Sequence, residues 1–139
     1  TAPSPNVTSA SREYTAAWKS MDGDYGAGGT SWSNYGAGAS AGAWFKLYTS
    51  IPVLVKTLEI WGWPNYGYNS FKFQGCNDDS TWVDILSSSC SNVTAWGQHH
   101  HFSLDDNTTP YKYHRFLCGS GWNATSIQIM EHIMTGYKY

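Results

Sequence analysis

Apolar and polar residues alternate along several short stretches of the chain, and the clearest alternation lies at residues 70–85. Phe71 and Phe73 are separated by polar residues, which is the period of a strand with one buried face. Turn-forming residues at 77–80 divide this run from a second one at 82–85. The pattern predicts a β-hairpin in the middle of the sequence.

Similar patterns predict further strands elsewhere in the chain. They lie at residues 44–48, 53–61, 102–104, 111–118 and 127–133, and a short edge strand is expected within 7–17, where the pattern is weak. The run 53–61 is the longest β-branched and apolar one, so it is expected to be a central strand, and Pro52 is expected to break the sheet before it. No stretch has a helical period. About eight short strands predict an all-β, antiparallel β-sandwich jelly roll, with one domain at 7–139 and a linker at 1–6.

Composition narrows the classes of function. The 139 residues suit one domain, and the net charge of -2 gives no basic surface for nucleic acid. Charged residues make up only 13% of the chain, whereas aromatic residues reach 17%, with 8 Trp and 10 Tyr. No run approaches the roughly 18 apolar residues that a membrane span needs. This balance favours a β-rich domain with aromatic loops.

Cysteines and glycosylation motifs bear on the compartment. There are 3 cysteines, so at least one is unpaired within the chain, and their spacing fits no zinc motif. Asn-x-Thr sequons begin at Asn6, Asn92, Asn107 and Asn123. Such a number suggests a secreted or virion-surface protein. In a bacterial or phage protein the same residues are simply polar turns.

Several motifs, taken in order, resemble those of discoidin-like domains, the group that includes the C-type domains of coagulation factors V and VIII and the family 32 carbohydrate-binding modules. The residues that carry this resemblance are Asn77-Asp78 followed by Ser80 and Trp82, Lys19–Asp24 with Trp32, Trp44–Leu47, Phe102–Leu104, Tyr113–Phe116 and Ser120–Asn123. Two positions depart from the family pattern: Tyr48-Thr49-Ser50 stands in place of Asp-Leu-Gly, and Cys76 in place of serine. The resemblance implies a galactose-binding-domain-like jelly roll. It also implies that loops at one end bind the ligand, and the candidates are 34–43, 62–69, 96–100 and 119–123.

A calcium site is a further expectation. Asp22 and Asp24 flank a glycine, so a tight turn brings two hard oxygen ligands together. Glu131 is expected on the same apolar face of the last strand as Ile127, Ile129 and Ile133, where a carboxylate needs a cation or hydrogen-bond donors. The resemblance implies that a structural Ca²⁺ is held by the Lys19 carbonyl, Asp22, Asp24, Thr30, the Met130 carbonyl and Glu131. The alternative is an Asx turn, with Glu131 paired to an amide or an arginine.

The segment His99–His101 has two functional interpretations: its histidines bind a metal ion, or they bind the hydroxyls of a sugar. Consecutive strand residues point to alternate faces, so only His99 and His101 can share an ion, and no third ligand is evident. In galactose-binding relatives a histidine bonds sugar hydroxyls, which the resemblance extends to these two. Exposed polar residues without a ligand are the plainer alternative.

Aromatic residues gather in the predicted loops. A sugar face packs on an aromatic ring while amides and imidazoles reach the hydroxyls, which makes a shallow site. The predicted ligand-binding residues are Trp63, Tyr66, Tyr68, Trp96, His99, His101, Trp122 and Asn123. By contrast, Trp32, Trp44 and Trp82 are expected in the core, and Arg115 is expected to be a structural cation.

No motif of catalysis is present, neither Gly-x-Ser-x-Gly, His-Glu-x-x-His nor Gly-Lys-Ser. The prediction is a non-catalytic, extracellular module that binds cell-surface or polymeric glycans within a larger assembly, such as a secreted glycosidase, an adhesin or a viral or phage fibre. The rival is a structural or protein-interaction domain whose aromatic loops pack on a neighbouring subunit. Membrane binding is disfavoured because the loops hold few basic residues.

Overall fold

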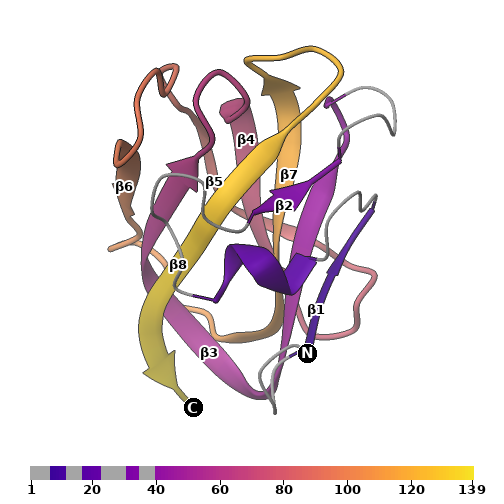
Figure 1. The fold of residues 1–139 in the computed structure, drawn as a ribbon. Helices are drawn as coiled ribbons and strands as arrows, with labels where there is room; N and C mark the ends of the chain where they lie inside the picture. Colours follow the sequence, from indigo (N-terminus) through magenta and orange to yellow (C-terminus); the bar gives the residue numbers. More distant parts are fainter. Residues whose placement is uncertain (1–6, 12–16, 23–30, 35–39) are drawn as a thin grey trace.

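The computed structural model describes residues 7–11, 17–22, 31–34 and 40–139, and these form an all-β domain (Figure 1). Its elements are β1 (Val7–Ala10), the 3-10 helix η1 (Ala17–Ser20), β2 (Trp32–Ser33), β3 (Trp44–Gly62), β4 (Tyr68–Cys76), β5 (Val83–Ser89), β6 (His99–Ser103), β7 (Tyr111–Gly121) and β8 (Gln128–Lys138). All the described strand pairings are antiparallel, so the predicted fold class is confirmed. No helix within the described ranges has the length and apolar character to cross a membrane.

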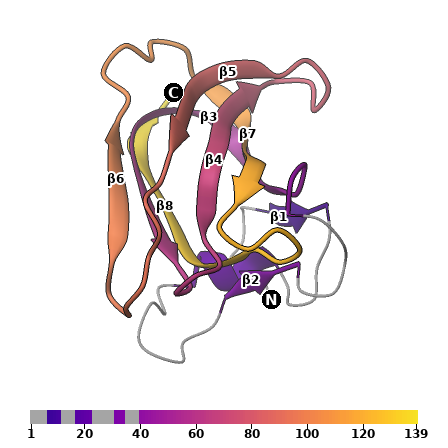
Figure 2. The same ribbon diagram turned by 90° about the horizontal axis from the view of Figure 1, so that it is seen from above.

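Strand β3 belongs to both layers of the sandwich. Its first part, from Trp44 to Tyr48, pairs with β7 and β1, and its second part, from Val53 onward, pairs with β8 and β6. The layers are therefore β5-β4-β7-β3-β1 and β2-β8-β3-β6, seen on opposite sides of the core in Figure 2. The predicted end of a strand at Pro52 is wrong in detail: the strand continues, but it bends and its β7 register shifts between Tyr48 and Val53. Proline has no N–H for a ladder, which fits this corner.

Aromatic rings make up most of the core between the layers. Phe45, Phe73 and Phe116, from one layer, are almost fully buried. The imidazole of His132, on β8 in the other layer, has its centroid 4.5 Å from the Phe45 ring and 4.4 Å from the Phe116 ring. Trp32 is also buried, as predicted. Burial of each large apolar side chain stabilises the fold by about 1.5–3 kcal/mol, so these contacts hold the two layers together.

The three cysteines are all buried within this fold. Cys76, Cys90 and Cys118 are free thiols, consistent with the prediction that at least one is unpaired. Burial raises the pKa of Cys90 and of Cys118 to about 12. A thiol that stays protonated at neutral pH is a poor nucleophile, so both act as small packing residues.

The predicted hairpin is β4 and β5, and its turn is capped by a carboxylate. Asp78 Oδ1 accepts hydrogen bonds from the backbone N–H groups of Ser80 and Thr81, at 3.0 and 2.8 Å, which lowers the pKa of this carboxyl. Asp79 takes a positive φ of 58°, a conformation that Asp tolerates better than most residues. The second strand extends beyond the predicted end at residue 85, to Ser89.

Two tryptophans expected in the core lie instead on the outer face of the sheet. Trp44 and Trp82 are both only partly buried. The Arg115 guanidinium lies 4.2 Å from the Trp82 ring centroid, and its Nε donates to Gln74 Oε1 at 2.6 Å. Arg115 is therefore a structural cation, as expected, and Trp82 is the ring on which it stacks.

A β-bulge at Met130 corrects the predicted faces of β8. Trp61 is opposite Glu131, whereas Gly62 is opposite Ile129, which leaves Met130 as an extra residue. Beyond the bulge, His132 is paired with the buried Ile60 and faces the core. Glu131 and Ile133 therefore face away from the core that receives Ile127 and Ile129, and the expectation of one shared face is wrong.

Candidate functional site

Three loops meet at the end of the sandwich that is uppermost in Figure 1: β3–β4, β5–β6 and β7–β8. Backbone hydrogen bonds join them to one another. Asn65 N donates to Val93 O at 2.8 Å, and Trp122 N donates to Gly67 O at 3.1 Å. The loops therefore form one connected surface, and it is the surface that holds most of the predicted ligand-binding residues.

Trp63 and Trp96 form an aromatic pair on this surface, although they come from different loops. Their ring centroids are 4.6 Å apart in an edge-to-face arrangement. Trp96 is 42% exposed and Trp63 is partly buried. Gly97, with a φ of 84°, turns the chain directly after Trp96. The pair presents an indole to solvent on a partly buried support, and Tyr66 follows in the same loop, also partly buried.

Trp122 is partly exposed, but a hydrogen bond holds its indole in place. The side chain of Asn123 caps backbone N–H groups of its own loop. Trp122 is 43% exposed, yet its Nε1 donates to Cys90 O at 3.0 Å, so the indole is tied to the chain between β5 and β6. Asn123 Oδ1 accepts from the backbone N–H groups of Thr125 and Ser126, both at 3.0 Å. This cap uses the amide oxygen of Asn123 and not its amide nitrogen, while the Trp122 indole stays partly exposed.

The prediction for Tyr68 is wrong, because this residue lies in the core with 1% exposure. Its hydroxyl lies 3.1 Å from His132 Nε2, and His132 Nδ1 lies 3.0 Å from Ser20 Oγ. Since Ser20 Oγ donates to Ala17 O, it accepts from Nδ1–H, and Tyr68 then donates to Nε2. Burial lowers the pKa of His132 to about 3, so the neutral ring is held between two partners. Tyr68 is thus a structural donor.

His99 and His101 share the outer face of the β6–β3–β8 layer. His99 stacks on Trp61, its partner across the strands, with centroids 4.0 Å apart, and His101 is opposite Glu59. His100 faces the other way and lies 3.1 Å from Ser91 Oγ; partial burial, with His99 nearby, lowers its pKa. No group of three or more His, Cys, Asp or Glu in the described part of the chain is arranged to hold a metal ion. His99 borders the loop surface, and His101 lies two residues farther from it along the strand.

A polar hollow of about 410 Å³ lies next to the aromatic pair. Its lining residues are Ser91, Asn92, Val93, Gly97, Gln98, His99 and His100. Asn92 Nδ2 donates to Asn65 Oδ1 at 2.9 Å, but Asn92 Oδ1 is buried without a hydrogen-bond partner among the described residues. A buried acceptor of this kind favours a ligand or a water that donates to it. Asn92 is not among the ligand-binding residues predicted from the sequence, where it is interpreted as part of a glycosylation sequon.

The residues of the expected calcium site are only partly within the described ranges. Asp24 and Thr30 lie outside them, as does the linker 1–6. Lys19 and Asp22 lie on and just after η1, which contacts β8, the strand that carries Met130 and Glu131. The bulge at Met130 turns the Glu131 carboxylate out of the aromatic core, and Glu131 is 4% exposed. These donors are hard oxygens, which fit Ca²⁺ rather than a thiophilic metal.

Comparison with known proteins establishes the fold. No protein-family model and no curated protein matches the chain. The family 32 carbohydrate-binding module of C. perfringens NanJ, solved with galactose, gives a TM-score of 0.75 at 14% identity, over 93% of this chain and 92% of that chain. Module CpGH89CBM32-5 from Clostridium perfringens, solved with GalNAc-β-1,3-galactose, gives 0.78 at 13% identity, over 93% and 94%. The family 32 module of AlyQ, solved with 4,5-unsaturated mannuronic acid, gives 0.71 at 17% identity, over 93% of both chains.

These similarities extend over nearly the whole chain at low sequence identity, so they support the assignment of the architecture. The resemblance stated from the sequence motifs is confirmed at the level of the fold, which is that of family 32 carbohydrate-binding modules.

Proposed function

We propose that residues 7–139 form a non-catalytic module that binds glycans at the loop end of the sandwich. The observation that carries the proposal is the pair Trp63–Trp96 beside a polar hollow with a free buried acceptor, Asn92 Oδ1. A sugar offers both matching groups, an apolar C–H face and hydroxyl donors. An aromatic ring with polar groups around it is the usual composition of a shallow sugar site.

In the proposed complex the exposed face of Trp96 packs on one face of a sugar ring. A hydroxyl of the same sugar donates to Asn92 Oδ1, and His99, held in place by stacking on Trp61, bonds a neighbouring hydroxyl. Trp122 supports a second sugar unit from the adjacent loop, since its indole is already fixed by Cys90. The site is preorganised, because the bonds that position these rings exist within the protein itself.

The ligands of proteins with the same fold support this assignment. Galactose, GalNAc-β-1,3-galactose and 4,5-unsaturated mannuronic acid each occupy such a module. We extend the class of ligand, a sugar or a uronic acid, to this chain. Shallow single sites bind weakly, so useful affinity requires several copies, and we assign the module to a larger extracellular protein or assembly.

A structural Ca²⁺ is part of the same proposal. Asp22 and Glu131 would supply carboxylate oxygens, and the backbone carbonyls of Lys19 and Met130 two further hard oxygens of the roughly six to eight that Ca²⁺ takes; Asp24 and Thr30 of the expected set lie outside the described residues. Support comes from the contact between η1 and β8 and from the bulge that places Glu131 outside the aromatic core. In this position the ion would brace η1 against the sheet rather than touch the ligand.

The test is a glycan array followed by titration calorimetry on the full chain, made in a host that leaves Asn92 unmodified. Trp96→Ala is expected to weaken binding at least about tenfold, since full burial of a large apolar side chain is worth about 1.5–3 kcal/mol. Trp44→Ala is the matched control: it removes another partly exposed tryptophan, on β3, and should leave affinity within about twofold. Equal losses in the two variants would contradict the site.

The same variants distinguish glycan binding from the rival function, that of a structural or protein-interaction domain. If the array retains no glycan, and the chain self-associates in a manner that Trp96→Ala abolishes, then the loop end is a protein interface. Sedimentation velocity of both variants measures this directly.

A further inference from the structure

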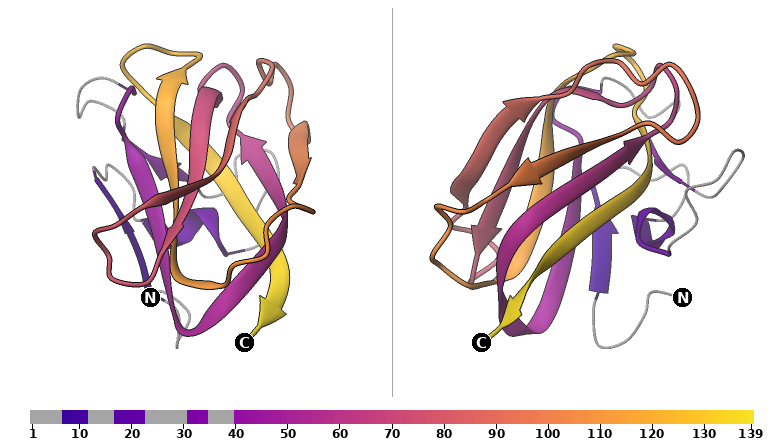
Figure 3. Two further views of the ribbon diagram at one scale, coloured as in Figure 1. Left: turned by 180° about the vertical axis from the view of Figure 1, so that it is seen from behind. Right: turned by 90° about the vertical axis from the view of Figure 1, so that its left-hand side faces the viewer.

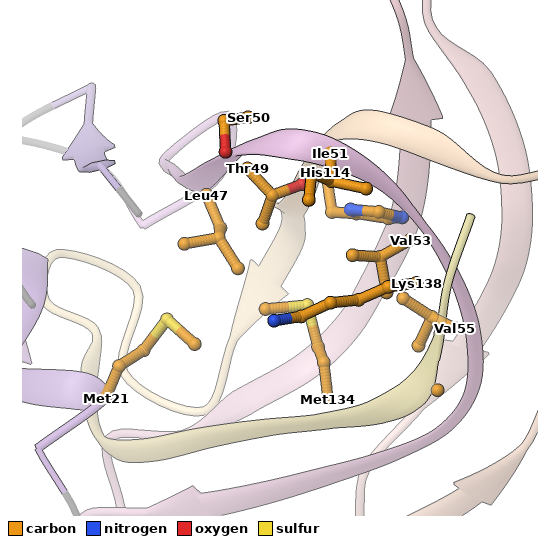
Figure 4. Close-up of a pocket in the computed structure, with 11 residues that line it drawn as sticks. Met21, Leu47, Thr49, Ser50, Ile51, Val53, Val55, His114, Met134 and Lys138 are labelled. Carbon is orange, nitrogen blue, oxygen red and sulfur yellow. The ribbon is translucent and has the colours of Figure 1, made fainter. Parts of the chain in front are cut away.

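A second cavity lies at the opposite end of the sandwich, inside the corner of β3 (Figure 4). It has a volume of about 260 Å³. Its apolar walls come from Met21, Leu47, Ile51, Val53, Val55 and Met134. The corner is lowermost in Figure 1, whereas the aromatic loops are uppermost, and Figure 3 shows the same separation from two further sides. The cavity is therefore distinct from the proposed glycan site.

The bend in β3 explains why a cavity forms here. The strand leaves one layer after Tyr48 and joins the other at Val53, so the side chains on the inner side of the corner diverge. Leu47 and Val55 face the cavity from the two arms of the strand and are buried, whereas Ile51, at the rim, is 47% exposed. The cavity is thus mainly apolar, with buried hydrocarbon at Leu47 and Val55 and polar groups at Thr49, Ser50 and Lys138, and it has an accessible edge.

One polar ring, that of His114, lines this apolar space. His114 is 2% exposed, and its ring stacks on Phe73 at a centroid distance of 5.6 Å. It makes a hydrogen bond with the Val53 backbone, but Nε2 is buried without a partner among the described residues. Thr49 does not donate a hydrogen bond to His114 Nε2, because the Thr49 hydroxyl donates to Lys112 O at 3.2 Å.

The protonation state of His114 fixes what it can accept. Burial lowers its pKa to about 4, so the ring is neutral at pH 7. In a neutral imidazole whose N–H is committed to a backbone carbonyl, the other nitrogen is an acceptor. A group that pairs with Nε2 therefore brings a donor, and the mainly apolar walls favour one with an apolar body.

We propose that the corner cavity is a second binding site, for a small phenol or alcohol whose hydroxyl donates to His114 Nε2 and whose ring or short alkyl body fills the apolar space. The size fits, because an apolar cavity of about 150 Å³ is already enough for benzene. A carboxylate has no proton to donate to His114 Nε2 and loses its hydration against the apolar walls. Lys138, whose side chain extends across the cavity in Figure 4, is the one group that favours it, so a carboxylate is included in the test.

The experiment is an NMR titration of the full chain with p-cresol, and with toluene and benzoate for comparison. The chain has 3 methionines, and two of them, Met21 and Met134, line the cavity, whereas Met130 does not. Saturable shifts of the Met21 and Met134 methyl signals, without a shift of Met130, are expected. The ¹⁵N signal of His114 Nε2 should move with p-cresol only, and p-cresol should bind at least about fivefold tighter than toluene.

Two variants test the location and the hydrogen bond. Ile51→Trp fills the rim and should abolish the shifts, whereas Val83→Trp, at an equally exposed position of 47% on β5, should not. His114→Phe should remove the advantage of p-cresol over toluene; if it fails to fold, the wild-type comparison of the two ligands still decides. Equal affinities for p-cresol and toluene in the wild type, tighter binding of benzoate, or shifts absent from both cavity methionines would each overturn the proposal.

Discussion

Acidification from pH 7 to pH 5 should destabilise this domain through two histidines that the fold keeps neutral. His132 is held between Tyr68 and Ser20 in the aromatic core, and His114 lies in the wall of the corner cavity. Burial lowers their pKa values to about 3 and about 4, from an ordinary value of 6.5. In this pH range the unfolded chain takes up protons at both positions, whereas the folded protein does not.

The direction and size of the effect follow from this difference. Because both folded-state pKa values are depressed, their contribution to stability is fully present above pH 6.5 and is lost as the pH falls toward 4 and then 3. At pH 5 the unfolded imidazole is about 1.5 pH units below its pKa, and one unit corresponds to about 1.36 kcal/mol. Each histidine therefore removes about 2 kcal/mol of unfolding free energy, and the pair removes about 4 kcal/mol.

Urea denaturation at pH 7, 6 and 5, followed by tryptophan fluorescence, measures this loss. His132→Gln and His114→Gln should each reduce the drop in unfolding free energy between pH 7 and pH 5 by about 2 kcal/mol, whatever their absolute stability. His101→Gln is the control, because it replaces a histidine that is exposed on the outer face and keeps both buried rings in place. Parallel pH dependences for the wild type and both buried-histidine variants would refute the reasoning.

Three further changes test other contacts. Tyr68→Phe removes the donor to His132 Nε2 and should cost about 1–3 kcal/mol in urea denaturation without weakening glycan binding; a stability within experimental error of the wild type would count against the hydrogen bond. Gly75→Ala places a Cβ against the Tyr111 ring and should cost about 1–3 kcal/mol, measured in the same way, and a neutral result would mean that the ring moves freely. Removal of Ca²⁺ with EDTA should lower the melting temperature, and Asp22→Asn should abolish that response while the EDTA effect persists in His101→Gln.

The sequence predicts the strands well where one face is buried. The period of two around Phe71 and Phe73 matches β4, since both side chains are buried in the structure. The predicted strand 53–61 matches the second arm of β3 closely. A strand that crosses between layers is harder to infer, because the pattern on each side of Pro52 is regular and only the pairing partners reveal one continuous element.

Aromatic residues are the least predictable part of the site. Trp63, Trp96 and Trp122 lie on the loop surface as expected, but Tyr68, from the same sequence cluster, lies in the core, where it bonds a histidine far away in the chain. Trp82 shows the reverse error, because its partner is a cation on the outer face. A ring suits either place, so its position depends on long-range partners that composition and spacing do not reveal.

The bulge at Met130 shows how such partners select a register. Without it, Glu131 would take the inward position, and a carboxylate would sit between aromatic rings with no N–H groups directed at it. With it, His132 takes that position, where Tyr68 and Ser20 satisfy both of its ring nitrogens. The extra residue costs a ladder hydrogen bond, but it places a fully bonded neutral ring, and not a carboxylate, between the aromatic side chains. The same shift leaves Glu131 on the face toward which a cation can be brought, so the core and the proposed calcium site depend on one irregularity of β8.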